Sequence, residues 1–453
     1  MRYIVPAKAN AKVTARIGEL GNRPSRLCFR PIALPESSSL MVVKYFQRAL
    51  VISGLLLFLV PVAEAQSSRP RRTAPQPDSL LLPQPTPTPA SRKTNTPLLD
   101  VQPVKPVGDA PVTPGTDTGD TTHAYSLFQQ GQYAAAAKEA KQLATADPRN
   151  AEAWKLAGFS ESALKQYDKA SEDLQKALDL QRAARQEDPN TLDLLAQAYV
   201  SVERFDQALP LLVIATTRAG ARPDAQMLYY RGFAEYKTGK TADAERTFNS
   251  VIKLNPKDSL SLYYVGQIAL TRNDLDGAVA ALNRATVNDP KLGAAWMQLT
   301  SAYLRRAASA TDKTKADSDY LNAVRAGEGL IKVRTDADAI TRFGQALIGA
   351  QQYARAATAL ERATAASDAS EVTFYLLGVA QSRAKNFPKA IAALERAAQK
   401  KPDDVNVYRE LGYAYEVMKQ YAKALSAYEK GLGLAPNDSD FKESADRVRP
   451  FAK

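Results

Sequence analysis

Residues 371–404 read EVTFYLLGVAQSRAKNFPKAIAALERAAQKKPDD, and residues 405–438 read VNVYRELGYAYEVMKQYAKALSAYEKGLGLAPND. Aromatic, leucine, glycine, alanine and proline residues recur at the same places in both segments. They are Phe374, Leu377, Gly378, Phe387, Ala390, Ala397 and Pro402 in the first, and Tyr408, Leu411, Gly412, Tyr421, Ala424, Gly431 and Pro436 in the second. A period of about 34 residues is typical of stacked helical pairs, so the pattern predicts an all-α repeat fold.

The pattern extends through most of the chain. Apolar residues recur at spacings of three and four, as in Leu262, Val265 and Ala269, which places them on one face of a helix. Dipeptides such as Asn255-Pro256 open a new unit, because proline is tolerated in the first turn of a helix. The spacing predicts a first unit from about residue 121, followed by units at 151–184, 189–222, 225–258, 259–292, 293–336, 337–370, 371–404 and 405–438.

These residues resemble the tetratricopeptide repeat family, whose units are helix–turn–helix pairs. The resemblance implies a right-handed superhelical solenoid of about nine repeats over residues 121–438, and residues 439–453 are expected to form a capping helix. Two units depart from the pattern. Residues 181–188 lengthen the second unit, and residues 307–319 insert a polar stretch between the helices of the sixth. We expect these insertions to form loops or longer helix ends.

Residues 41–65 have the composition of a secretory signal peptide. A basic start is followed by an apolar run from Ala49 to Val60 and by the small-residue motif Ala63-Glu64-Ala65. This order predicts export and cleavage before Gln66, with an uncleaved anchor as the alternative. Residues 1–40 show no helical or strand period, and we expect translation to start at Met41, which would make this upstream segment a misassigned start.

Residues 66–120 are rich in proline, threonine and serine. Closely spaced prolines exclude helix and favour an extended, solvated chain, so this segment is predicted to be a disordered linker. A docking ligand for a proline-recognition module is the alternative interpretation of the same composition.

Composition argues against several function classes. The net charge of +12 comes half from residues 1–65, and the repeat region carries 45 basic and 40 acidic residues, so a nucleic-acid partner is not expected. The only cysteine, Cys28, and the only histidine, His123, have no companions in a catalytic or metal-binding pattern. We therefore expect no catalytic residues, no metal, no cofactor and no enzymatic activity.

The family resemblance implies that the first helix of each pair lines a concave groove. Helical register then places aromatic and arginine side chains in that groove, and these are typical anchors at protein interfaces. An apolar peptide with an acidic or carboxylate end near the two arginines is the expected ligand. Packing between helices is the alternative role for individual tyrosines. The predicted partner-binding residues are Phe159, Tyr229, Phe233, Tyr236, Tyr263, Tyr375, Arg383, Arg409 and Tyr413.

The sequence thus predicts a non-enzymatic scaffold that binds segments of partner proteins in the bacterial cell envelope, as a periplasmic or secreted protein. Membrane association is expected only through the signal sequence, if it stays uncleaved. The alternative is an accessory protein of the cell wall or of exopolysaccharide, in which the same tyrosines stack on sugar rings.

Overall fold

The computed structural model describes residues 120–218, 224–366 and 369–453. The predicted upstream segment and signal peptide lie outside these residues, and so does the predicted linker except for Asp120.

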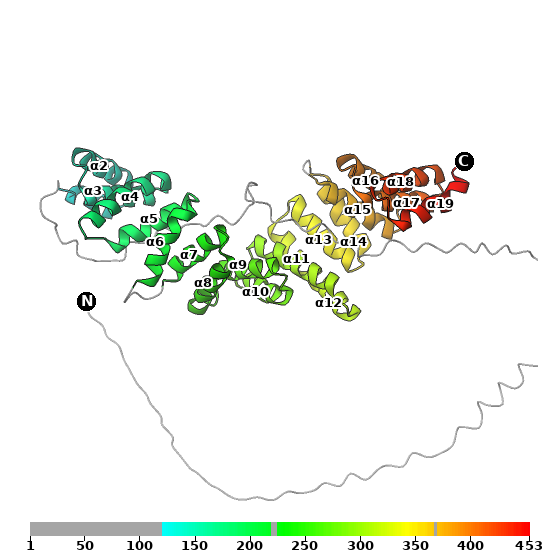
Figure 1. The fold of residues 1–453 in the computed structure, drawn as a ribbon, viewed down its shortest axis with the longest axis horizontal. Coiled ribbons are helices and arrows are strands. Elements are labelled where there is room, and N and C mark those ends of the chain that lie inside the picture. The colour runs from blue at the N-terminus through cyan, green and yellow to red at the C-terminus, as the bar shows by residue number, and fades with distance from the viewer. Residues whose placement is uncertain (1–119, 219–223, 367–368) are drawn as a thin grey trace, which may run out of the picture. The chain divides into compact units, whose positions relative to one another are not determined.

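All regular structure in the described residues is helical, and no strand occurs among them. Nine helical pairs follow one another in this described part of the chain, and consecutive helices pack side by side (Figure 1). The all-α repeat fold is confirmed. The first helices are α1 (Thr122–Gln129), α3 (Ala151–Ala163), α5 (Pro189–Ser201), α7 (Ala225–Lys237), α9 (Ser259–Thr271), α11 (Gly293–Ser309), α13 (Ala337–Gly349), α15 (Glu371–Arg383) and α17 (Val405–Val417). The second helices are α2 (Tyr133–Ala146), α4 (Tyr167–Ala183), α6 (Phe205–Thr217), α8 (Thr241–Leu254), α10 (Leu275–Asn288), α12 (Lys313–Val333), α14 (Tyr353–Thr364), α16 (Phe387–Lys400) and α18 (Tyr421–Leu434).

Side-chain caps fix the starts of most first helices and of the terminal helix that begins at Ser439, whereas α1 and α11 have none. Asn150 accepts a hydrogen bond from the amide of Ala153 at the start of α3, and Asp258 accepts one from Ser261 at the start of α9. Each such cap stabilises a helix by about 1 kcal/mol, because it satisfies an amide that has no partner within the helix. Equivalent caps are formed by Asp188, Asp224, Asp336, Ser370, Asp404 and Asp438.

In six pairs, the two helices pack closely because the first helix has a glycine at the contact. Six first helices carry a glycine that faces a large side chain of the second helix. At Gly378, for example, a Cβ atom would lie 2.4 Å from Cγ of Leu394, which is fully buried. The recurring glycine is therefore a packing requirement of the pair. The six glycines are Gly158, Gly232, Gly266, Gly344, Gly378 and Gly412.

The sixth pair absorbs its insertion by lengthening both helices. α11 has 17 residues, where most first helices have 13, as α13 does. α12 has 21 residues, where second helices such as α8 and α10 have 14. Arg306 near the end of α11 donates to both carboxylate oxygens of Asp319 at 2.8 and 2.7 Å, and to Asp276 of α10 at 2.7 Å. These bonds tie the extended ends together, so the polar stretch forms longer helix ends. Likewise, α4 extends to Ala183 in the second pair.

The buried apolar side chains form two main clusters that meet at the sixth pair. One extends from Ala170 to Ala326, and the other from Leu304 to Val448, with Tyr303 packed against both. At the end of the array, α19 (Ser439–Val448) buries Phe441 against α18 and is followed by a 3-10 turn, Arg449–Phe451. This last helix covers an apolar face that would otherwise be exposed.

Candidate functional site

Several first helices keep partly exposed side chains. First helices of neighbouring repeats contact each other at several joints, including α3 with α5, α11 with α13 and α15 with α17. We call the partly exposed side chains of these helices the first-helix face. It includes Phe159, Tyr236, Gln267, Arg342, Arg383, Arg409 and Tyr413.

Three first helices are tied to the turn that precedes them by the same kind of hydrogen bond, from an aromatic side chain to a proline carbonyl. The indole Nε1 of Trp154 donates to the carbonyl of Pro148 at 3.1 Å, and Trp296 does the same to Pro290 at 2.9 Å. The Tyr408 hydroxyl bonds to the Pro402 carbonyl at 2.9 Å. Because this aromatic side chain belongs to the fourth residue of α3, α11 and α17, it gives these first helices the same rotational setting relative to the preceding turn.

Four of the predicted groove aromatics are buried instead of open to a partner. The exposed fractions of Tyr229, Phe233, Tyr263 and Tyr375 are 6, 7, 5 and 6%. The expectation that these rings project into an open groove is thus corrected. Their place is between helices, which was the alternative role for individual tyrosines.

The rings around Tyr229 pack on one another. Tyr229 stacks on Phe233 with ring centroids 6.3 Å apart, and Tyr264 stacks on Phe248 at 5.1 Å. Burial raises the pKa of Tyr229, Tyr263 and Tyr264 above the ordinary phenol value, so these hydroxyls stay protonated. The cluster joins α7, α8 and α9 and belongs to the core.

Three predicted aromatics keep part of their surface exposed: Phe159, Tyr236 and Tyr413. The Tyr236 hydroxyl donates to Oε1 of Gln267 on the next first helix at 2.9 Å, which fixes the ring across the joint of α7 and α9. Tyr413 meets the ring of Phe387 edge-on at 6.2 Å. Rings held in this way offer contact area without further loss of side-chain freedom.

Both predicted arginines are already paired within the chain. Arg383 donates to the two carboxylate oxygens of Glu410 at 3.0 and 2.9 Å, and Glu410 is buried. Arg409 binds Asp438 and, at 3.2 Å, Asp440. The prediction that these two arginines bind an acidic end of a ligand is therefore corrected, because carboxylates of the chain itself already bind both guanidinium groups.

The sequence pattern did not single out Arg342 on α13. This side chain is partly exposed, and Nη1 donates to Oε1 of Gln345 at 3.0 Å. Burial lowers the pKa of Arg342, with Asp338 acting in the opposite sense. The sequence does give the position of Arg342 within its repeat. Arg342 precedes Gly344 by two residues, as Glu410 precedes Gly412, so the two residues occupy equivalent positions.

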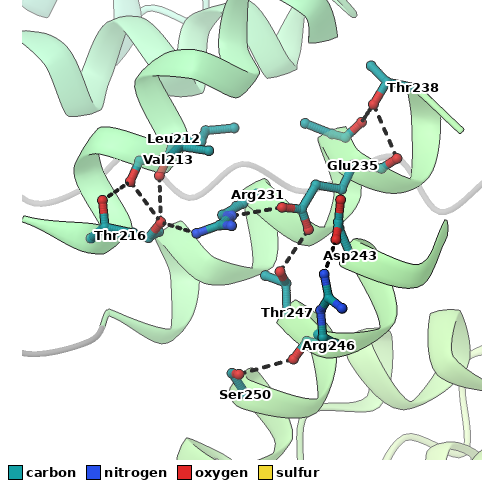
Figure 2. Close-up of polar contacts among 12 residues, drawn as sticks. Leu212, Val213, Thr216, Arg231, Glu235, Thr238, Asp243, Arg246, Thr247 and Ser250 are labelled. Atoms are coloured by element: carbon teal, nitrogen blue, oxygen red, sulfur yellow. Dashed lines mark hydrogen bonds and ion pairs between the residues drawn. The ribbon is translucent and has the colours of Figure 1, made fainter. Parts of the chain in front are cut away.

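A polar network ties α6, α7 and α8 together beside a hollow of about 230 Å³ lined by Leu228, Arg231, Asp243, Arg246, Thr247 and Ser250. Figure 2 shows Arg231 between Thr216 of α6 and Glu235 of its own helix, at 3.1 and 2.8 Å. Glu235 also accepts from Thr247 of α8 at 2.7 Å. Arg246 pairs with Asp243. Each arginine has a carboxylate, so the hollow carries no net positive charge and the network is a structural tie.

The repeats show neither a metal-site cluster nor a membrane-spanning helix in their described parts. Within residues 120–218, 224–366 and 369–453, no three His, Cys, Asp or Glu side chains gather as a metal site would need. No helix in the same residues is long and apolar enough to cross a bilayer.

Comparison with known proteins identifies the repeat. The tetratricopeptide repeat model matches residues 121–190, 231–292 and 375–439. No curated protein matches the chain.

Several solved structures are similar. The C-terminal part of a repeat-containing protein from Cytophaga hutchinsonii is 14% identical with a TM-score of 0.43, and the match covers 56% of this chain and 98% of that one. A thermophilic tetratricopeptide repeat protein of Thermus thermophilus is 19% identical with a TM-score of 0.32, over 43% of this chain and 100% of that one. YrrB, described as having an unusual peptide-binding site, is 18% identical with a TM-score of 0.36, over 44% and 97%. Residues 121–190, 231–292 and 375–439 therefore carry tetratricopeptide repeats, and the helical pairs of the described residues have the helix–turn–helix form of that family.

Proposed function

We propose that this protein is a non-catalytic scaffold whose first-helix face binds segments of partner proteins in the bacterial cell envelope. Repeats of this family serve as protein–protein interaction scaffolds, which supports the general role. To this general role we add the envelope location and the binding face. The location is supported by the signal-like composition of residues 41–65.

One observation carries the choice of face. The residue that follows the packing glycine is a partly exposed ring or amide at Phe159 of α3, Gln267 of α9 and Tyr413 of α17, and it is buried on the other three first helices that carry this glycine. Aromatic rings supply rigid apolar contact, and amides pair with the backbone of an extended segment. Helices that are already packed lose little entropy when they present this surface.

Crosslinking in the native envelope tests the face. A variant with Phe159, Tyr236 and Tyr413 all changed to Ala should lose captured proteins while its helical circular dichroism stays unchanged. The matched control changes Leu254, Val287 and Leu434 to Ala, because these side chains lie on second helices and are 49, 69 and 39% exposed. Equal capture by both variants would refute the binding face.

Two other measurements address the rest of the proposal. Amino-terminal sequencing of the protein recovered from the periplasm should begin at Gln66, and recovery only from the cytoplasm would refute the location. Co-sedimentation with isolated peptidoglycan, without capture of any protein, would support the wall-associated alternative.

A further inference from the structure

Two joints of the array differ in charge at equivalent positions. At the joint of α15 and α17, the thirteenth residue of the earlier first helix is Arg383 and the sixth residue of the later one is Glu410. They form a two-bond ion pair at 3.0 and 2.9 Å. This pair shows that these two positions face each other across a joint of neighbouring first helices.

At the joint of α11 and α13, the same positions hold two cations. The thirteenth residue of α11 is Arg305, and the sixth residue of α13 is Arg342. α11 and α13 are in contact, as α15 and α17 are. No other joint between the described first helices places two cations at these positions.

Arg305 turns away from this joint. Its Nη1 donates to the carbonyl of Leu270 at 3.1 Å and its Nη2 to Oδ1 of Asn273 at 2.8 Å, both at the end of α9. Arg383 instead reaches forward to the next first helix. With cations at both positions, this joint cannot form the ion pair that joins α15 and α17.

Arg342 is left with one hydrogen bond, to Gln345, and forms no ion pair within the described part of the chain. A guanidinium group has five N–H donors and favours a two-bond contact with a carboxylate. Asp338, one turn earlier on α13, is exposed and makes no ion pair with it. The sixth position, which is Glu410 at the other joint, is therefore a partly desolvated cation at this one, and neither of the two positions holds a carboxylate.

We propose that Arg342, joined by Arg305, binds an aspartate or glutamate side chain of a partner segment. The ligand's carboxylate supplies the negative charge that Glu410 supplies at the joint of α15 and α17. Arg305 is held only by neutral acceptors, so it can exchange them for a charged one. This inference rests on the proposed function, and it names the acidic residue that a partner must bring to the first-helix face.

The test uses a phage library of random dodecapeptides selected on the full chain. Peptides that bind are resynthesised with an amidated C-terminus, and their affinities are measured by titration calorimetry. We expect an essential Asp or Glu in them. Changing that residue to its amide, or changing the protein by Arg342→Gln, should each weaken binding about tenfold to a hundredfold, the range for charge-assisted hydrogen bonds. Both changes together should cost little more than one, because they remove the same contact.

Arg325→Gln is the control, because Arg325 is exposed on α12 and hydrogen-bonds only Asn322 within the described residues. It should leave affinity unchanged. Selected peptides that need no acidic residue, or that bind Arg342→Gln as well as the native chain, would overturn this inference alone. Recovery of peptides that need a free C-terminus in place of an acidic side chain would overturn it too. Failure to select any peptide would overturn the proposed function along with it.

A second measurement needs no ligand. Arg342→Glu restores the charge order of the α15 and α17 joint, with Arg305 available as the partner. We expect this variant to melt several degrees above the native chain and to bind none of the selected acidic peptides. A lower melting temperature would show that a carboxylate at this joint is unfavourable, and it would contradict the proposal.

Discussion

Gly266 of α9 lies directly against Leu282 of α10, so that a Cβ atom at Gly266 would be 2.5 Å from Cγ of Leu282. Leu282 is fully buried and cannot move aside without disturbing its neighbours. The small residue in the family pattern is therefore explained by a contact between the two helices of one pair.

Gly266→Ala should lower stability by about 1–3 kcal/mol, because it overfills this contact. Gly433→Ala in α18 is the control, since nothing lies within 4 Å of a Cβ atom there. It should raise stability by about 0.5–1 kcal/mol, because alanine favours helix. Urea denaturation followed by circular dichroism measures both. If Gly266→Ala raised stability, α9 and α10 would be able to move apart at this contact without a loss of free energy.

Glu410→Gln should destabilise the last two repeats strongly. Glu410 is 1% exposed and its partner Arg383 is 13% exposed, so the substitution leaves a buried guanidinium without its counter-charge. Breaking a buried pair of this kind costs about 3–5 kcal/mol. The surface pair of Arg449 and Glu429 provides the comparison, and Glu429→Gln should change stability by less than about 1 kcal/mol. Similar melting temperatures for the two variants would contradict the structural role of Arg383.

Stability should fall as pH rises from about 4.5 to 7, through Glu161 of α3. Burial, and then the nearby charge of Asp173 on α4, raise the pKa of Glu161 from 4.5 to about 7, against the opposing effects of Lys141 and Lys169. The folded chain then binds more protons than the unfolded chain within this window, so this contribution to stability is present at low pH and is lost as pH rises.

Glu161→Gln should flatten this part of the curve of melting temperature against pH. Glu443→Gln, at an exposed position of α19, should leave the slope as it is. If the native chain and Glu161→Gln show the same pH dependence, Glu161 does not titrate in this window.

Tyr229→Ala and Phe233→Ala should each destabilise the chain by about 3–5 kcal/mol, as expected when a buried aromatic ring is removed. Both rings are in the core cluster of α7, α8 and α9. Tyr236→Ala should cost less, because Tyr236 is partly exposed. Loss of partner capture in the first two variants would therefore say nothing about binding unless their melting temperatures are unchanged. Unchanged melting would contradict their assignment to the core.

The fold followed from the sequence because its information is local and repeated. Small residues at fixed spacing, such as Gly378 and Ala390, specify how two adjacent helices meet, and capping residues such as Asp404 specify where each helix begins. The sixth repeat was less clear, because a polar insertion can form either a loop or a longer helix. The ion pair between Arg306 and Asp319 accompanies the second outcome.

The site followed only in part. Helical register predicted open positions for all the groove aromatics, and it could not separate Phe159, Tyr236 and Tyr413, which are partly exposed, from Tyr229 or Tyr375, which are buried. Burial depends on what a neighbouring helix places opposite each ring, and that neighbour lies about 34 residues away in the chain. The same limit applies to charge. Arg383 and Arg409 look available in the sequence, and only the contacts show that carboxylates already bind them.

The amino-acid sequence by itself determined the type of helix pair, the number of pairs and the recurrence of a small residue such as Gly378 where the two helices meet, because these depend on contacts within one repeat. Tertiary structure decided which side chains remain for a partner, because contacts between repeats bury rings such as Tyr263 and neutralise cations such as Arg383. Arg342 occupies on α13 the position that Glu410 has on α17, and only the contacts show that Arg383 is bound by a carboxylate whereas Arg342 donates to the amide of Gln345.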